Sequence, residues 1–237
     1  MRYFSTFTGI GAFEQAVKNI GLGWECVGYS EIDPYAIKVF EKNHPGYRNH
    51  EDIRSIVGKL IGGFPSTCPD FDLLVGGSPC QDLSIAKKGR QGLKGSRSSL
   101  FWEFVRLLEL KKPRYFLLEN VASMKKEDRD TISRVLGVEP VMINAALVTA
   151  QQRKRLFWCN WKVEQPEDKE IYLQDILEGA AITEAKKSYC IDYHYPKARL
   201  ADYVGHRRRQ MVFEKTDPKH TQPVSYTHLT LPTTPYV

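Results

Sequence analysis

The feature that most constrains the fold is a regular alternation of short apolar segments with amphipathic segments over residues 2–161. The apolar run at 115–118 is too short for a helix, whereas residues 99–111 place Leu100, Phe104 and Leu107 on one helical face. This alternation predicts an α/β protein with a doubly wound sheet of buried parallel strands. We expect strands at residues 2–7, 25–30, 72–75, 115–118, 141–149 and 155–160. We expect helices at residues 11–20, 34–43, 99–111 and 128–136.

The alternation ends after Trp161. Residues 172–177 fit either a short helix or a strand, and residues 180–224 have no sustained hydrophobic period. The final stretch contains no Asp, Glu, Lys or Arg and is rich in Thr and Pro. A natural disordered C-terminus is one interpretation of it, and a non-native tail is the one we favour. We therefore expect a core domain at 1–162, an incomplete second unit at 163–224 and a non-native tail at 225–237.

Charge and cysteine usage narrow the class of protein. The 34 Lys and Arg against 28 Asp and Glu give a net charge of +6, which permits a polyanionic partner without requiring one. The uncharged stretches are far shorter than the roughly 20 apolar residues of a membrane span. The chain has five cysteines without a Cys-x-x-Cys motif or zinc-like spacing, so we expect reduced thiols and no metal site. With no secretory signal at the start, a cytoplasmic location is expected.

Doubly wound sheets bind ligands beyond the carboxyl ends of their strands, so the loops there are the places to look for a site. The first loop runs from Phe7 through Gly9 and Gly11 into a predicted helix. Glycines let a ligand approach the backbone, and a helix N-terminus offers free N–H groups to an anion such as a phosphate or a carboxylate. Close packing of the helix is the alternative explanation for this Gly-x-Gly.

Acidic residues follow the second predicted strand and open a later turn. Glu31 can accept hydrogen bonds from both hydroxyls of a ribose, and Ile32 can pack on an adenine face. Asp33 before a proline suits a helix N-cap. Asp52 can accept from an adenine amino group or can equally be another N-cap.

The segment Gly-Gly-Ser-Pro-Cys-Gln at 76–81 is the strongest local signal. Two glycines free the backbone after a strand, and Pro79 fixes the approach to Cys80. Most lone cysteines are small buried hydrophobes, but a thiol on a loop at this edge of the sheet suits a nucleophile better. Nine Lys or Arg lie within 85–114, where they favour a loop that closes over a phosphate backbone.

Two further charged groups come later in the chain. Glu119 follows the apolar run at 115–118, and a carboxyl placed there can donate a proton or a hydrogen bond. Arg153 and Arg155 share one face of a strand and suit a phosphate or a base oxygen. A satisfied strand-end carboxylate and a solvated charge run are the alternatives.

Taken in order, these motifs resemble the cytosine-C5 DNA methyltransferases. The resemblance runs through 2–161, and the short link between Glu119 and Arg155 resembles a subgroup with phage enzymes and the catalytic domain of the eukaryotic de novo methyltransferases. It implies a Rossmann-like S-adenosyl-L-methionine-dependent methyltransferase sheet followed by the start of a target-recognition region. The residues that match the cofactor pocket of the family are Phe7, Gly9, Gly11, Glu31, Ile32 and Asp52.

The resemblance also implies a mechanism. Cys80 attacks C6 of a cytosine that has left the duplex, and Glu119 holds the N3 and amino edge of the base. Arg153 and Arg155 fix the flipped base and the loop that carries the cysteine. The partner is double-stranded DNA, no metal is needed, and a cognate restriction endonuclease would be a partner in function rather than in a complex. The remaining expected substrate contacts are Pro79, Gln81 and Asn120.

Two alternatives remain open, namely a tRNA cytosine-C5 methyltransferase and a non-catalytic DNA-binding or regulatory relative. The sequence also departs from the family, because complete members return from the recognition region to the core through a Gly-Asn-containing helix start. No Gly-Asn dipeptide occurs in these 237 residues. We therefore expect an incomplete enzyme that binds the cofactor poorly and has little or no activity.

Overall fold

The computed structural model describes residues 1–79, 100–178, 181–183, 185–189, 212–214 and 222–224. The chain divides into two compact units, which are Met1–Met142 with Arg155–Val163 and Ile143–Lys154 with Glu164–Val237. The first unit ends at Val163, one residue after the boundary at 162 that the sequence predicted. In contrast, residues 143–154 group with the second unit, although we expected them in the first. The expected tail at 225–237 and the candidate residues Cys80 and Gln81 lie outside the described residues.

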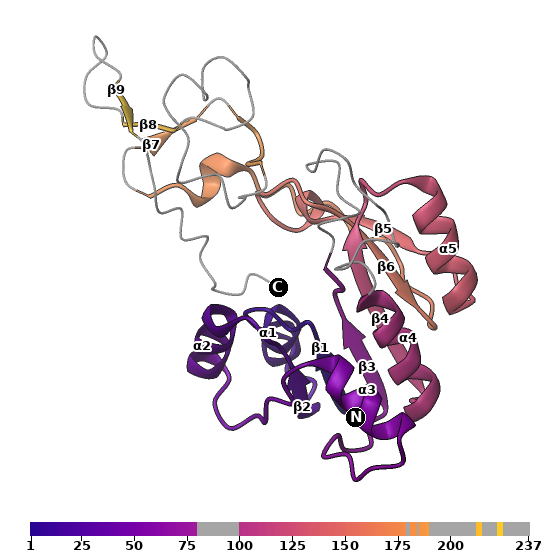
Figure 1. Cartoon of the computed structure of the whole chain (residues 1–237). Helices are drawn as coiled ribbons and strands as arrows, with labels where there is room; N and C mark the ends of the chain where they lie inside the picture. The colour runs from indigo at the N-terminus through magenta and orange to yellow at the C-terminus, as the bar shows by residue number, and fades with distance from the viewer. Residues whose placement is uncertain (80–99, 179–180, 184, 190–211, 215–221, 225–237) are drawn as a thin grey trace. The chain divides into compact units, whose positions relative to one another are not determined.

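A six-stranded sheet forms the centre of the fold, in the order β2-β1-β3-β4-β6-β5 (Figure 1). Strands β1 to β4 pair in parallel, whereas β6 runs antiparallel to β4. The predicted α/β class is therefore confirmed, with a mixed sheet in place of a purely parallel one. The strands are β1 (Arg2–Thr6), β2 (Glu25–Ser30), β3 (Leu73–Gly76), β4 (Tyr115–Val121), β5 (Val141–Asn144) and β6 (Lys154–Cys159).

Helices cover both faces of this sheet. The larger core packs α3, α4 and α5 against sheet residues such as Phe4, Leu74 and Leu118, all of which are fully buried. On the other face, Val17 of α1 packs with Tyr3. Every residue of β3 is buried, as expected for a strand covered on both sides. The helices are α1 (Ala12–Asn19), α2 (Pro34–Asn43), α3 (Ile53–Ile61), α4 (Leu100–Lys111) and α5 (Lys126–Leu136).

Helix α3 was not expected, because only a turn was predicted around Asp52. Its buried residues Ile53, Ile56 and Val57 follow helical spacing, and the Asp52 side chain caps the first turn by accepting from Arg54 N. Gly58 lies inside the helix and weakens the local helical signal.

The strand expected at 141–149 was too long. β5 ends at Asn144, whose side chain accepts from Ala146 N and opens the 3-10 turn η2 (Ala145–Leu147). A local side-chain bond of this kind competes with the sheet ladder. The segment at 172–177, for which helix and strand both remained open, contains the 3-10 turn η3 (Leu173–Ile176).

The second unit also holds a small antiparallel sheet in the order β7-β8-β9. Its strands are β7 (Ala181–Ile182), β8 (Val212–Glu214) and β9 (Gln222–Val224). In the part of the chain that the structure describes, no helix is long and apolar enough to cross a membrane.

Candidate functional site

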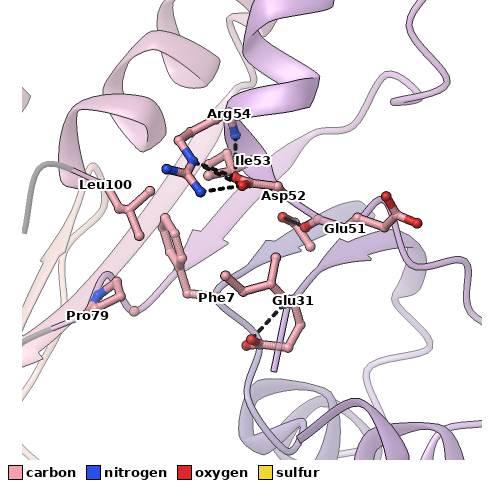
Figure 2. A pocket seen from close by; sticks show the side chains of 11 residues that line it. Phe7, Glu31, Glu51, Asp52, Ile53, Arg54, Pro79 and Leu100 are labelled. Atoms are coloured by element: carbon pink, nitrogen blue, oxygen red, sulfur yellow. Dashed lines mark hydrogen bonds and ion pairs between the residues drawn. The ribbon is translucent and has the colours of Figure 1, made fainter. Parts of the chain in front are cut away.

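A pocket lies beyond the carboxyl ends of β1, β2 and β3, in the place expected for a doubly wound sheet. It has a volume of about 560 Å³, part of which is open to solvent. Figure 2 shows the Phe7 ring in the middle of the lining, with Pro79 and Leu100 to its left and Glu31 to its right. The lining residues are Phe7, Ser30, Glu31, Ile32, Glu51, Asp52, Ile53, Arg54, Gly77, Pro79 and Leu100.

Two lining residues have an uncommon backbone conformation. Phe7 has φ 53° and Glu51 has φ 59°, in the left-handed region that residues with a Cβ seldom adopt. Backbone strain of this kind gathers at ligand sites, where the surrounding structure holds it in place. The strain lies on both sides of the pocket, one residue beyond β1 and two residues before α3.

The Glu31 carboxylate is oriented by three backbone N–H groups. Gly9 N donates to Oε2 at 2.8 Å, while Ile32 N and Asp33 N donate to Oε1 at 2.8 and 2.9 Å. Glu31 thus links the turn after β1 to the end of β2, and Oε2, for which Gly9 N is the one donor among the described residues, keeps a lone pair for a ligand donor. Asp33, and not Glu31, caps α2, which confirms the predicted cap.

Asp52 is held by its neighbour Arg54, a lining residue that the sequence analysis missed. Oδ1 accepts from Arg54 N at 2.9 Å, and the guanidinium Nη2 lies 2.6 Å from Oδ2 (Figure 2). The hydrogen bond from Arg54 keeps the pKa of Asp52 below its ordinary value. The N-cap interpretation of Asp52 is therefore confirmed, and the carboxylate remains part of the pocket wall.

The two glycines of the first loop differ in their surroundings. A Cβ on Gly11 would lie 2.6 Å from Cδ2 of His44 and 2.9 Å from Cδ2 of Phe40, so this glycine allows close packing against the end of α2. A Cβ on Gly9 would meet no atom within 4 Å. Both glycines are described, yet neither is among the lining residues, so their contact with a cofactor stays a prediction.

The segment that leads to Cys80 is fastened to β4. Asn120 Nδ2 donates to Ser78 O at 3.1 Å and lies 3.2 Å from Ser78 Oγ, and both side chains are buried. A Cβ on Gly77 would come within 3.1 Å of Glu119 Oε2, so the backbone passes close to this carboxylate. The expected contact of Asn120 with substrate stays a prediction, and its geometry supports a role in holding the loop.

Glu119 forms an ion pair with Arg155, whose Nε lies 2.6 Å from Oε1. Glu119 stands inside β4 opposite Phe157 of β6, because the strand runs on to Val121. This corrects the expectation that Glu119 follows the strand. The carboxylate is about one-third exposed, so it is held in place while one side remains accessible.

Arg153 belongs to the second unit, whereas Arg155 belongs to the first. Arg153 precedes the first residue of β6, and its backbone N donates to Asn144 Oδ1 at 3.1 Å. Its backbone oxygen accepts from Ala145 N at 3.0 Å. The structure thus brings together Arg155 and Glu119, and it describes Arg153 separately within its own unit.

The pocket chemistry indicates the kind of ligand it can hold. The acidic side chains of Glu31 and Asp52 line the pocket together with the apolar side chains of Phe7 and Ile32, whereas the Glu51 carboxylate points away from it (Figure 2). Such a wall suits a ligand with an apolar face, hydrogen-bond donors and positive charge, and it is poorly suited to a pyrophosphate. Among the described residues no group of three His, Cys, Asp or Glu side chains could hold a metal ion.

Comparison with known proteins bears on this geometry. The family model described as C-5 cytosine-specific DNA methylase matches residues 1–228. The chain belongs to this family. The resemblance read from the order of the motifs is therefore confirmed.

Curated relatives of this methylase family come from phages and bacteria. The orphan methyltransferase M.Rho11sI of Bacillus phage rho11s is 33% identical over 93% of the chain and 45% of its own length. The type II methyltransferase M.NgoBV of Neisseria gonorrhoeae is 34% identical over 74% of the chain and 40% of its own length. The chain thus spans less than half the length of these curated relatives.

The fold of the family also appears in a solved structure. A prophage-encoded protein of E. coli, described as a DNA modification methyltransferase, matches with a TM-score of 0.58 and 22% identity. The match covers 74% of this chain and 53% of that one, and it supports the methyltransferase-type α/β fold.

Proposed function

We propose that the chain carries the cofactor pocket and the nucleophile of an enzyme that methylates C5 of cytosine in double-stranded DNA. The observation that carries the proposal is the position of the 77–79 segment, which leads directly to Cys80. Gly77 and Pro79 line the pocket, and the Gly77 backbone passes beside the Glu119 carboxylate. A nucleophile that follows this segment would be close to both a cofactor pocket and the Glu119 side chain.

S-adenosyl-L-methionine would supply an electrophilic methyl group. Glu31 would accept hydrogen bonds from the ribose hydroxyls, and Asp52 would accept from the adenine amino group. Ile32 and Phe7 would contact the adenine face. Membership of the methylase family and the acidic, partly apolar wall both support this cofactor.

The proposed chemistry uses Cys80 as a thiolate that bonds to C6 and makes C5 nucleophilic. C5 would take the methyl group with S-adenosylhomocysteine as the leaving group. A base such as water then removes the C5 proton, the electrons of that C–H bond restore the C5–C6 double bond, and the sulfur–C6 bond breaks to return the thiolate. Glu119 would hold N3 and the amino edge of the base, and Arg155 would keep that carboxylate in place. Arg153 would help to fix the flipped base.

The alternatives find less support. The family model that matches the chain is described as a DNA methylase, which disfavours the tRNA substrate. A non-catalytic relative has no need of the Glu119–Arg155 pair. A cognate restriction endonuclease would act on the same DNA sites without forming a complex with this chain. Because the relatives come from a phage and a bacterium, we propose that the protein acts in the cytoplasm of a bacterial or phage-infected cell.

Covalent trapping tests the proposal. The probe is a pool of duplex oligonucleotides with randomised sequence, in which one strand carries 5-fluorocytosine in place of cytosine. Fluorine at C5 cannot leave as a proton, so the sulfur–C6 bond persists after methyl transfer. Because a single slow turnover is enough to trap a molecule, even a weakly active chain should form a denaturation-resistant complex when S-adenosyl-L-methionine is added in excess. The complex should be lost in Cys80→Ser.

Cys68→Ser is the matched control. Burial raises the pKa of the Cys68 thiol to about 11, so it should not react, and its replacement should leave trapping intact. A tRNA pool with the same substitution tests the alternative substrate. Trapping that survives in Cys80→Ser, or that occurs with tRNA alone, would contradict the proposed function.

A further inference from the structure

Lys187, in the second unit, makes an unusual set of contacts for a lysine. Its Nζ donates to the backbone oxygens of Ala146 at 2.7 Å, Ile171 at 2.6 Å and Thr149 at 3.2 Å. An ammonium group has three N–H donors, so these carbonyls use all of them. The same Nζ lies 5.3 Å from the centre of the Tyr172 ring. One side chain thus joins the turn at 145–149 to residues 171–172.

The residue after Lys187 continues this connection through the backbone. Ser188 N donates to Ala150 O at 2.6 Å, and Gln152 N donates to Ser188 O at 2.8 Å. These bonds form a parallel bridge between Gln151 and Ser188, and Ser188 is only 3% exposed. The segment at 186–188 is therefore paired with the three residues that precede Arg153.

Arg153 is fixed from its other side as well. Its N donates to Asn144 Oδ1, and its oxygen accepts from Ala145 N. The carbonyls of Ala146 and Thr149 would lose a partner if Lys187 were absent, since removing one partner of a partly buried hydrogen bond leaves the other group unsatisfied. The conformation of the whole 145–153 loop thus depends on a residue more than thirty positions later.

We propose that Lys187 is a positioning residue that sets the conformation of the 145–153 loop and hence the placement of Arg153 toward the substrate. This rests on the proposed function for the role of Arg153. In this proposal the segment that contains Lys187, at the start of the expected target-recognition region, supports the catalytic residues in addition to contacting DNA. A lysine suits the task because a compact ammonium can serve three diverging carbonyls, whereas the planar guanidinium of arginine serves them less evenly.

Three variants of the full 237-residue chain test the inference. Lys187→Met keeps the stem and removes the donors, Lys187→Arg restores donors, and Lys186→Met changes an exposed neighbour as the matched control. Hydrogen exchange of the Gln152 and Ser188 amides should accelerate about tenfold in Lys187→Met and less in Lys187→Arg. It should be unchanged in Lys186→Met.

Function separates a positioning role from a merely structural one. In Lys187→Met the rate of 5-fluorocytosine trapping should fall about tenfold or more, with partial rescue in Lys187→Arg. The affinity for S-adenosylhomocysteine should stay the same, because the proposed cofactor pocket lies in the first unit. If the native chain traps no DNA, the proposed function fails while hydrogen exchange still decides the inference. Unchanged exchange in Lys187→Met, or equal loss of trapping in Lys186→Met, would overturn it.

Discussion

Single side chains carry much of the organisation around the pocket. The Glu31 carboxylate gathers three backbone N–H groups from two loops, and Asp52 caps α3 while it holds Arg54. In both residues three N–H donors use most of the roughly four lone-pair sites of the carboxylate, which leaves about one for a ligand donor. The structural and ligand-binding interpretations of these acids are therefore compatible.

Asn120 offers the first prediction at this scale. Asn120→Ala should lower the rate of trapping by Cys80 about tenfold or more, because Ser78 loses the amide that holds the segment leading to the nucleophile. S-adenosylhomocysteine affinity, measured by calorimetry, should change little.

The matched control is Asn160→Ala, since Asn160 follows β6 and contacts the backbone at the beginning of β4. Asn160 also braces the backbone through its amide, accepting from Phe116 N and donating to Arg114 O. Its loss should reduce stability without slowing trapping. Equal effects of the two variants on trapping would count against a specific role for Asn120.

Arg54 gives a second prediction, which concerns how the cofactor is recognised. If Arg54 orients Asp52 toward an adenine amino group, Arg54→Gln should weaken S-adenosylhomocysteine binding about fivefold, the value of one hydrogen bond of about 1 kcal/mol. The inosine analogue lacks the amino group and should bind both proteins equally. Lys59→Gln, on the same helix, is the control for a general loss of charge.

The residues of the candidate site differ in how well their positions could be predicted from the sequence. Glu31, Ile32 and Asp52 stand at strand and helix ends, where local pattern and fold class together mark a site. Arg54 and Leu100 could not be found in this way, because their place in the pocket depends on how α3 and α4 pack on the sheet. The Glu119–Arg155 pair needed the antiparallel register of β4 and β6, which no local motif encodes.

Among the helices, α3 is the hardest to predict from the local sequence. Its burial pattern is helical, but it is short and has Gly58 in its interior, and short helices gain most of their stability from packing. Residues Ile56 and Val57 supply that packing against the larger core.

Gly58 therefore gives an element-scale prediction. Gly58→Ala should stabilise the protein by about 0.5–1 kcal/mol, because alanine loses less conformational entropy in a helix. A Cβ at this position would meet no atom within 4 Å, and φ is not in the left-handed region. Urea unfolding measures the change.

Gly11→Ala is the opposite case for comparison. Its φ is +90° and its Cβ would collide with His44 and Phe40, so this variant should be destabilised. A loss of stability in Gly58→Ala equal to that in Gly11→Ala would show that α3 is not an ordinary helix.

For the whole molecule, the buried His44 and the partly buried His50 predict the response to acid. Burial lowers the pKa of His44 and His50 below their ordinary value of 6.5, with help from Lys18 and Arg48 respectively. In mild acid the unfolded chain therefore binds more protons than the folded chain. Stability should be full above about pH 6.5 and fall as the pH drops below it.

Glu14 acts in the opposite direction, since burial raises the pKa of its carboxyl and favours the protonated folded state as pH falls. A variant without the two histidines separates their contribution to the acid response from that of Glu14. The difference in melting temperature between about pH 7.5 and about pH 5.5 should shrink in the double variant His44→Phe, His50→Phe. An unchanged difference would mean that other groups cause the acid response.

The alternation of strands and helices foretold the fold class and most elements, because each short strand and amphipathic helix is a local property of the sequence. The division into units was harder to foresee. Residues 143–154 group with the second unit although they include the end of β5 and the first residue of β6, and distant contacts such as those of Lys187 lie behind this grouping.

The position of residues 143–154 ahead of β6 in the chain has a consequence for synthesis on the ribosome. β6 is the neighbour of β4 in the sheet, but the ribosome makes residues 143–154 before it completes β6. β4 therefore stays without this neighbour while that segment is synthesised. A nascent chain that stalls before residue 159 would carry β4, an apolar strand, without its partner on one side. Uncovered strand edges recruit other chains, so premature termination in this interval should produce aggregates rather than a smaller soluble domain.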